Sequence, residues 1–261
     1  MSIRLSADEQ QVQPTTIDYP ASDGEPMAET EQHILAMLYL IGALRHYFRH
    51  AADVYVIGNM FLYYIEGKPN ARRAPDVMVI KGVGKQTRRI YKLWEEKVAP
   101  CAIFEVTSRQ TKSDDIVGKS ALYASLGVRE YFLFDPLHDY LDRQLEGYRL
   151  ADKVYLPIPP NEDGEIFSEE LQLILQPDGA MLRLIDPKTG ETLPGLEEAL
   201  DRIAQEAERA QQAIQRAEHE AQRAEHEAQR AEQETQRAAA AEAEVARLRA
   251  LLAERNPGHE G

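Results

Sequence analysis

Residues 101–108 read CAIFEVTS, and this stretch decides what kind of core the chain builds. Five of its first six residues are apolar, which is typical of a buried β-strand. Glu105 stands in the middle of the run. Burying an ionised carboxylate without a partner costs several kcal/mol or forces the group to take up a proton. The stretch therefore predicts a core strand in which another group shares the site of Glu105.

The segments on either side alternate between strand-like and helix-like patterns. Further strands are expected where β-branched and aromatic residues gather, at 53–58, 60–67, 75–80 and 129–136. The first two are predicted to form a hairpin, because the Gly58–Asn59 pair between them suits a tight turn. Helices are expected at 27–50, mostly buried, and at 114–127, ending at Gly127.

Short strands continue beyond Asp135, separated by turn residues. They are expected at 144–150, 154–158, 171–179 and 180–190, as an antiparallel extension on the edge of the sheet. The order of helix, strands, helix and strand indicates an α/β fold with a mixed β-sheet flanked by helices. We assign residues 26–195 to this domain and residues 1–25, which are polar and lack periodicity, to a flexible N-terminal tail.

The last quarter of the chain has a different composition. Residues 196–256 are rich in Ala, Glu, Gln and Arg, and a seven-residue repeat runs through AEHEAQR, AEHEAQR and AEQETQR at 217–237. The apolar positions of a coiled coil fall on Ala217, Ala221, Ala224, Ala228 and Ala231, and later on Val245, Leu248 and Leu252. This pattern predicts a long helix that forms a homodimer or higher oligomer, followed by a tail at 257–261. A solitary helix stabilised by Glu–Arg pairs fits the same spacing.

The charge and cysteine content limit the functional classes. The formal net charge is −14, and because 196–256 holds 14 acidic and nine basic residues, the rest of the chain carries −9. Such a balance argues against a general affinity for polyanions. The single cysteine, Cys101, allows no disulfide framework. With no signal core and no apolar stretch long enough to cross a bilayer, we expect a cytoplasmic protein with no membrane partner.

A second acid is predicted to lie beside Glu105. Asp76 heads an apolar strand directly after Pro75. Two carboxylates at adjacent strand ends repel each other unless a proton or a cation lies between them. Mg²⁺ prefers oxygen ligands and is commonly held by one or two carboxylates. The pair therefore indicates a site for Mg²⁺ or Mn²⁺.

Lys119 supplies a candidate cation. Ile116, Lys119, Tyr123 and Leu126 follow helical spacing, so Lys119 points along the apolar stripe of its helix. Two carboxylates, a divalent ion and a lysine can hydrolyse a phosphodiester, because the metal activates water and the ammonium stabilises developing charge. The alternative is a lysine that passes along the core and exposes its ammonium.

The order of these motifs is similar to that of a known group of nucleases. Pro75-Asp76, the strand with Glu105 in FEVTS, the helix with Lys119 and then GVREYFLFDP resemble the PD-(D/E)XK nuclease superfamily, and more closely the bacterial Uma-two group of restriction-endonuclease-like proteins. The similarity covers residues 27–190. It implies a restriction-endonuclease-like fold with Asp76 and Glu105 as metal ligands and catalytic residues.

The resemblance has one departure and adds further candidates. The superfamily's lysine usually stands two residues after the second acid, where this chain has Thr107. The resemblance to the Uma-two group implies that the lysine comes from the following helix instead, which makes Lys119 the matching catalytic cation. The superfamily often adds an acid from the first helix, and here Glu29 or Glu31 would supply it. The remaining substrate-binding candidates are polar or basic side chains near these motifs: Glu29, His33, Lys85, Arg88, Arg89 and Thr107.

The leading hypothesis is a Mg²⁺-dependent endonuclease that cleaves DNA. The alternative is a non-catalytic nucleic-acid-binding or assembly module whose working part is the C-terminal helix, which the acidic charge and Thr107 favour. A phosphoesterase or nuclease acting on RNA or branched DNA is a third possibility, because the sequence contains no base-reading motif.

Overall fold

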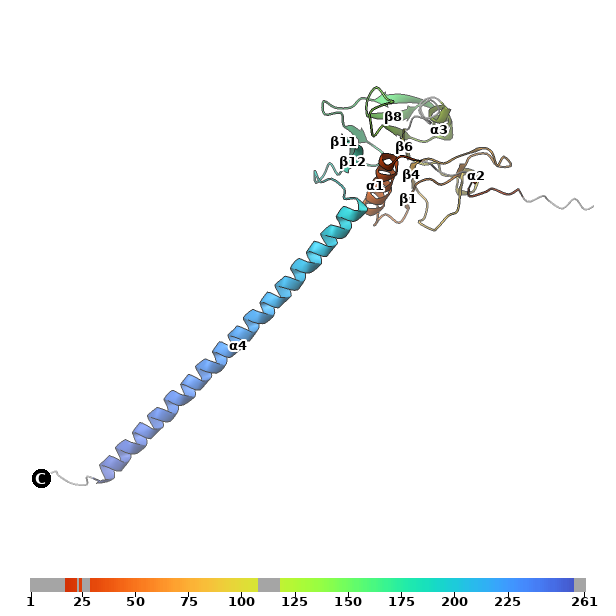
Figure 1. The fold of residues 1–261 in the computed structure, drawn as a ribbon. Coiled ribbons are helices and arrows are strands. Elements are labelled where there is room, and N and C mark those ends of the chain that lie inside the picture. Colours follow the sequence, from red (N-terminus) through yellow and green to blue (C-terminus); the bar gives the residue numbers. More distant parts are fainter. Residues whose placement is uncertain (1–16, 23, 25–28, 108–117, 256–261) are drawn as a thin grey trace, which may run out of the picture. The chain divides into compact units, whose positions relative to one another are not determined.

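The computed structural model describes residues 17–22, 24, 29–107 and 118–255, and divides after Glu198 into a globular unit and the unit that follows it. The globular unit is built around a six-stranded sheet in the order β1-β4-β6-β7-β8-β9 (Figure 1). The strands are β1 (Val54–Ile57), β4 (Val77–Lys81), β6 (Ala102–Val106), β7 (Glu130–Phe134), β8 (Leu145–Ala151) and β9 (Val154–Ile158). Only β6 and β7 pair in parallel within this order. The predicted α/β class with a mixed sheet flanked by helices is confirmed.

Two helices cover the sheet. Helix α1 (Glu31–Tyr47) is capped by the side chain of Thr30 and packs with the core on one face; helix α3 (Ser120–Leu126) contributes Tyr123 to the core on the other. Gly127 ends α3 in the left-handed conformation (φ 83°), as predicted. The predicted start of this helix at 114 lies outside the described residues.

The first helix is less buried than predicted. Its inner face buries Ala36, Tyr39, Leu40, Ala43 and Leu44. On its outer face, however, Leu35 and Leu38 are 49% and 56% exposed. Apolar residues surround α1 almost continuously in the sequence, so periodicity alone could not show that only one face has a partner.

The hairpin predicted at Gly58–Asn59 is wrong. β1 pairs with β4, whereas β2 (Leu62–Tyr63) joins β3 (Arg72–Arg73) and β5 (Tyr91–Lys92) in a separate sheet, which leads into α2 (Leu93–Glu96). Asn59 is in the left-handed region (φ 53°), and its N–H donates to the carbonyl of Pro75 at 2.9 Å. The Gly-Asn pair therefore attaches the end of β1 to the segment before β4 and does not turn the chain back on itself.

The later strands divide between two sheets. β8 and β9 extend the edge of the main sheet antiparallel, as predicted. β10 (Ile166–Ser168), β11 (Leu173–Asp178) and β12 (Met181–Ile185) form a sheet of their own, so the prediction of one continuous extension is wrong for these strands. Their buried leucines pack in the same core as α1.

Residues 17–20 are not part of a flexible tail, contrary to the prediction. The carbonyl of Pro20 accepts a hydrogen bond from the Tyr63 hydroxyl at 2.6 Å, and the Tyr19 hydroxyl accepts one from the Gly67 N–H at 2.7 Å. The Tyr19 ring meets the Tyr63 ring edge-on, with centroids 5.1 Å apart. Aromatic contacts of this kind follow no periodic pattern, so they cannot be predicted from the sequence.

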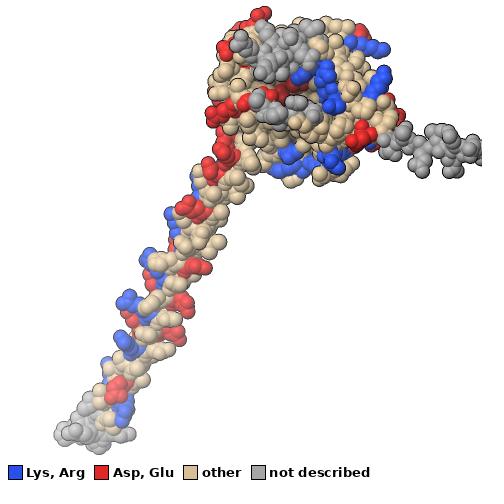
Figure 2. Space-filling model, turned by 45° about the vertical axis from the view of Figure 1, so that its right-hand side comes forward, with Lys and Arg blue, Asp and Glu red and all other residues tan. Residues whose placement is uncertain are grey.

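Helix α4 (Leu196–Arg255) fulfils the prediction of a long C-terminal helix. Of its residues 196–251, whose side chains are described, all but Ala199 are exposed, and acidic and basic side chains both occur along its length (Figure 2). Among the residues that the structure describes, no helix combines the length and apolar character needed to cross a bilayer.

Candidate functional site

Glu105 is buried with two partners on the following helix. Its side chain is 1% exposed and lies on the face of β6 that carries Ile103, toward α3. The Lys119 ammonium donates to Oε2 at 2.9 Å, and the Tyr123 hydroxyl donates to Oε1 at 2.8 Å. The group that shares the site of Glu105 is thus the predicted lysine, joined by a tyrosine.

Tyr123 is a site residue that the sequence analysis treated only as part of an apolar stripe. Burial raises the pKa of Tyr123 well above its usual value, and the neighbouring Glu105 carboxylate adds to the shift. The phenol therefore stays protonated and acts as a hydrogen-bond donor. Its spacing of four residues from Lys119, one helical turn, is the signal that could have revealed it.

Asp76 lies beside Glu105 across two neighbouring strands. β4 and β6 pair antiparallel with Val77 opposite Phe104, so one step further along this register Asp76 stands opposite Glu105. Directly opposed residues of antiparallel strands project from the same face, with Cβ atoms about 5 Å apart. The N–H of Val106 donates to Asp76 Oδ2 at 2.7 Å and fixes the carboxylate against β6. The two acids predicted to share a cation are therefore neighbours.

Gly58 permits this placement of Asp76. A Cβ built on Gly58 would lie 2.3 Å from the Asp76 carbonyl oxygen and 2.5 Å from Ile41 Cδ1. Side chains do not approach backbone this closely, so only glycine lets β1 pack against Asp76 and α1 at this point. The glycine read as a turn residue is in fact a packing requirement of the site.

His33 connects the first helix to the acid pair. It is 4% exposed, its Nε2 lies 3.3 Å from Asp76 Oδ1, and its Nδ1 lies 3.3 Å from Glu29 Oε2. Burial lowers the pKa of His33, but the hydrogen bond with Asp76 and the charges of Glu29 and Glu105 outweigh this effect. The pKa of His33 is therefore raised above its usual 6.5, and the ring favours its protonated form.

Thr107, at the position of the superfamily's usual lysine, is also buried. It is 3% exposed, and its N–H donates to the carbonyl of Phe134 at 2.7 Å. Within the described part of the chain its hydroxyl oxygen has no hydrogen-bond partner. The structure thus places a polar group without a partner at this position, while the ammonium reaches Glu105 from Lys119.

The donor set suits a hard cation. In the described ranges no three His, Cys, Asp or Glu residues form a cluster that could hold a metal ion. Mg²⁺ is commonly held by one or two carboxylates together with water and substrate phosphate. Asp76 and Glu105 meet that requirement.

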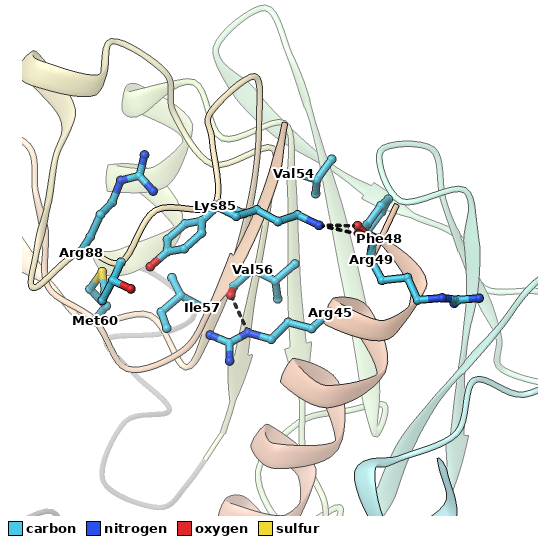
Figure 3. Close-up of a pocket in the computed structure, with 11 residues that line it drawn as sticks. Arg45, Phe48, Arg49, Val54, Val56, Ile57, Met60, Lys85 and Arg88 are labelled. Carbon is cyan, nitrogen blue, oxygen red and sulfur yellow. Dashed lines mark hydrogen bonds between the residues drawn. The ribbon is translucent and has the colours of Figure 1, made fainter. Parts of the chain in front are cut away.

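The basic residues predicted to bind substrate lie in another part of the unit. Lys85 and Arg88 line a pocket beside β1, where the Lys85 ammonium donates to the carbonyls of Phe48 and Arg49 (Figure 3). Arg88 pairs with Glu96 at 2.6 Å. Arg89 is exposed. The structure brings Glu29, His33 and Thr107 together with the acid pair, and groups Lys85 and Arg88 elsewhere.

The chain was compared with known proteins. The family model Uma2, described as "Putative restriction endonuclease", matches residues 7–177. A solved structure described as "a putative nuclease belonging to DUF820 from Anabaena variabilis ATCC 29413" is 15% identical, with a TM-score of 0.42 over 56% of this chain and 76% of that chain. No curated protein matches.

Proposed function

Because the chain belongs to the Uma2 family of restriction-endonuclease-like proteins, we propose that it is a Mg²⁺-dependent nuclease that hydrolyses phosphodiester bonds in DNA. The observation that carries the proposal is the placement of Asp76 opposite Glu105, with the Lys119 ammonium 2.9 Å from Glu105. A core that buries these charges without using them would lose stability relative to an apolar one.

Asp76 and Glu105, which stand opposite each other in the register of β4 and β6, would hold the metal through their carboxylate oxygens. Val106 and Tyr123 keep the two carboxylates in place, because each donates a hydrogen bond to one of them. When bound, Mg²⁺ supplies Lewis-acid polarisation of the phosphodiester and a lowered pKa for water. The protein's own contribution is a fixed pair of ligands at the end of two core strands.

Lys119 and His33 place positive charge around the acid pair. The Lys119 ammonium, 13% exposed, can orient an attacking water or stabilise negative charge on the phosphate oxygens in the transition state. The pKa of His33 is raised by its hydrogen bond with Asp76 and by the nearby carboxylates, which favours a second positive charge next to Asp76. Together they would offset the repulsion between a polyanionic substrate and the carboxylates of Asp76 and Glu105.

Plasmid nicking tests the proposal. Supercoiled DNA is incubated with the full chain and Mg²⁺ or Mn²⁺, beside the isosteric variants Asp76→Asn and Glu105→Gln. The control is Asp178→Asn, which changes an exposed carboxylate paired with Arg183. We expect nicking by the wild type and the control and a loss of at least about 100-fold in both site variants, the scale of removing an electrostatic catalytic group. Equal activity in all four proteins contradicts the proposal.

The same assay separates the alternative functions. RNA and branched DNA offered beside the plasmid test the substrate class, since no base-reading motif distinguishes them. If the folded wild type cleaves none of these with either metal, the non-catalytic module is favoured. Thermal melting of each variant shows whether the fold is retained.

A further inference from the structure

A basic pocket lies at the edge of the main sheet, apart from the acid pair. β1 is the terminal strand of the sheet, and the C-terminal half of α1 lies beside it (Figure 3). The pocket has a volume of about 510 Å³. Its charged lining residues are Arg45, Arg49, Lys85 and Arg88, and Phe48 and Met60 are among its apolar ones.

The pocket concentrates positive charge in an otherwise acidic protein. Four of its lining residues are Arg or Lys, and none is Asp or Glu. Outside 196–256 the chain carries a net charge of −9. Of the four cations, Arg88 is neutralised by its pair with Glu96. The pocket is therefore positive overall, and its charge complements an anion.

Hydrogen bonds to the backbone fix the cations in position. Arg45 donates through Nε to the Val56 carbonyl at 2.9 Å, on the outer edge of β1. Lys85 donates to the carbonyl of Phe48 at 2.7 Å, at the end of α1. Arg49 donates through Nη1 to the His46 carbonyl at 3.0 Å. A guanidinium has five N–H donors, so Arg45 and Arg49, both exposed, keep donors for a ligand beyond these bonds.

One side of the pocket is aromatic. The Arg88 guanidinium lies 4.7 Å from the Tyr55 ring centroid, and Phe48 and Met60 add apolar surface. Tyr55 itself is only 8% exposed and lies under the Arg88 guanidinium, so this wall contributes packing. The contacts left for a nucleic acid are those between its phosphates and the cations.

The chain links the pocket to the acid pair through the end of β1. Ile57 lines the pocket, and the next residue, Gly58, packs against the backbone of Asp76. A nucleic-acid backbone that leaves the pocket along β1 would therefore run toward Asp76.

We propose that this pocket binds backbone phosphates of the nucleic-acid substrate on the side of the cleaved bond that runs along β1. The inference rests on the proposed nuclease function for the position of the cleaved bond. Arg45 and Arg49 make the phosphate contacts, Lys85 and Arg88 shape the pocket, and the contact is independent of base sequence.

Binding at several salt concentrations tests the proposal without requiring cleavage. Fluorescence anisotropy of a labelled 20-base-pair DNA is measured in EDTA, for the wild type, Arg45→Gln/Arg49→Gln and the single variant Arg49→Gln. The control, Arg143→Gln/Arg216→Gln, removes two exposed arginines that lie outside the pocket. Loss of two phosphate contacts should reduce the slope of log K against log salt by about 1.8 and weaken binding on the order of 50-fold at 0.1 M salt. Arg49→Gln alone should show about half of that slope change.

Three outcomes are decisive. A pocket double variant that binds like the control, or a wild type that does not bind DNA, overturns the proposal. A slope that is reduced in the pocket variants and not in the control supports the proposal. If the wild type binds DNA in this way but cleaves nothing, the nuclease proposal fails and the binding site stands. Arg49→Gln keeps the Arg45 hydrogen bond to β1, so it remains informative if the double variant is unstable.

Discussion

Charged side chains have opposite environments in the globular unit and in α4. At the acid site Glu105, Thr107 and His33 are each less than 5% exposed, and the two ionisable groups have charged partners within 3.3 Å. Along 196–251 of α4 every side chain except that of Ala199 is exposed. Desolvating charge lowers stability unless partners compensate, so a fold keeps buried charge where a function requires it. The buried charges of the acid site therefore indicate a catalytic or binding site, whereas the exposed charges of α4 indicate a helix that is solvated or associates with another helix.

The charges of α4 restrict what can pack against it. Its apolar seam begins upstream of the alanines, with Leu200, Ile203 and Ile214 in the same register and 56%, 63% and 59% exposed. Within the repeat both positions that flank the seam are glutamate, for example Glu218 and Glu220. In a coiled coil of two identical helices these flanks would face each other. Self-association through α4, which we propose on the basis of the seam, would therefore be opposed by charge.

The largest effect is expected from removing one partner of the buried ion pair. Glu105→Ala leaves the Lys119 ammonium and the Tyr123 hydroxyl without their carboxylate, which should lower the free energy of unfolding by about 3–5 kcal/mol. Glu220→Ala on α4 is the control and should leave the unfolding of the globular unit unchanged. Urea denaturation followed by tyrosine and tryptophan fluorescence measures both. Equal stability of the two variants would show that the site is not an energetically coupled pair.

Gly58→Ala should disturb the site through packing alone. Its Cβ would overlap the Asp76 carbonyl oxygen at 2.3 Å, and overpacking of this kind costs about 1–3 kcal/mol. The control is Gly42→Ala within α1, where a Cβ meets its nearest atom at 3.7 Å and replaces a poor helix former, so a small gain in stability is expected. Thermal melting and nicking assays on both variants check this. A stable, active Gly58→Ala protein would remove the assigned role of Gly58.

His33 and His46, at the two ends of α1, should give pH dependences of opposite sign. The pKa of folded His33 is raised, so its stabilising contribution is complete below the unfolded pKa of about 6.5 and is lost as pH rises through the folded value. The pKa of His46 is lowered by burial and then by Arg49 and His50, so its contribution to stability increases as pH rises toward 6.5. Denaturation of His33→Gln and His46→Gln between pH 5 and 9 measures the contribution of each histidine to the free energy of unfolding. A His33→Gln profile parallel to the wild type contradicts the assignment.

The smallest effect is expected from salt on α4. Screening of the facing glutamates should strengthen self-association of the full chain as salt rises from 0.05 to 0.5 M, and Glu218→Gln/Glu220→Gln/Glu225→Gln/Glu227→Gln should associate more strongly at low salt. Sedimentation equilibrium measures the association constant. An association that weakens with salt would indicate attractive contacts, and a monomer under all conditions would favour the solitary helix.

The contrast between the globular unit and α4 also explains how much of the structure could be predicted from the sequence. The proximity of Asp76, Glu105 and Lys119 could be predicted because Asp76 heads an apolar strand, Glu105 and Lys119 interrupt apolar patterns, and their order matches that of a nuclease superfamily. Helix α4 was predictable from a strict repeat that needs no tertiary contact. The strands at 75–80, 101–107 and 129–136 were predicted because buried strands have distinctive composition.

The failures involve contacts between distant segments. The function of Gly58 depends on Asp76 and Ile41, which no local turn rule includes. Tyr123 was counted as apolar, since a buried phenol is identified as a donor only when its acceptor is known. The separate β10-β11-β12 sheet follows from which strand edges meet, and that choice is set by packing against α1.

The central claim is that Asp76 and Glu105 bind one divalent cation between them. Crystals of the full chain soaked in Mn²⁺ and measured for anomalous scattering test it directly, with the Asp76→Asn variant treated in the same way. The account predicts an anomalous peak within about 2.3 Å of a carboxylate oxygen of both residues in the wild type and its loss in the variant. A wild-type map without a peak at this pair, or with one that persists in Asp76→Asn, would contradict it.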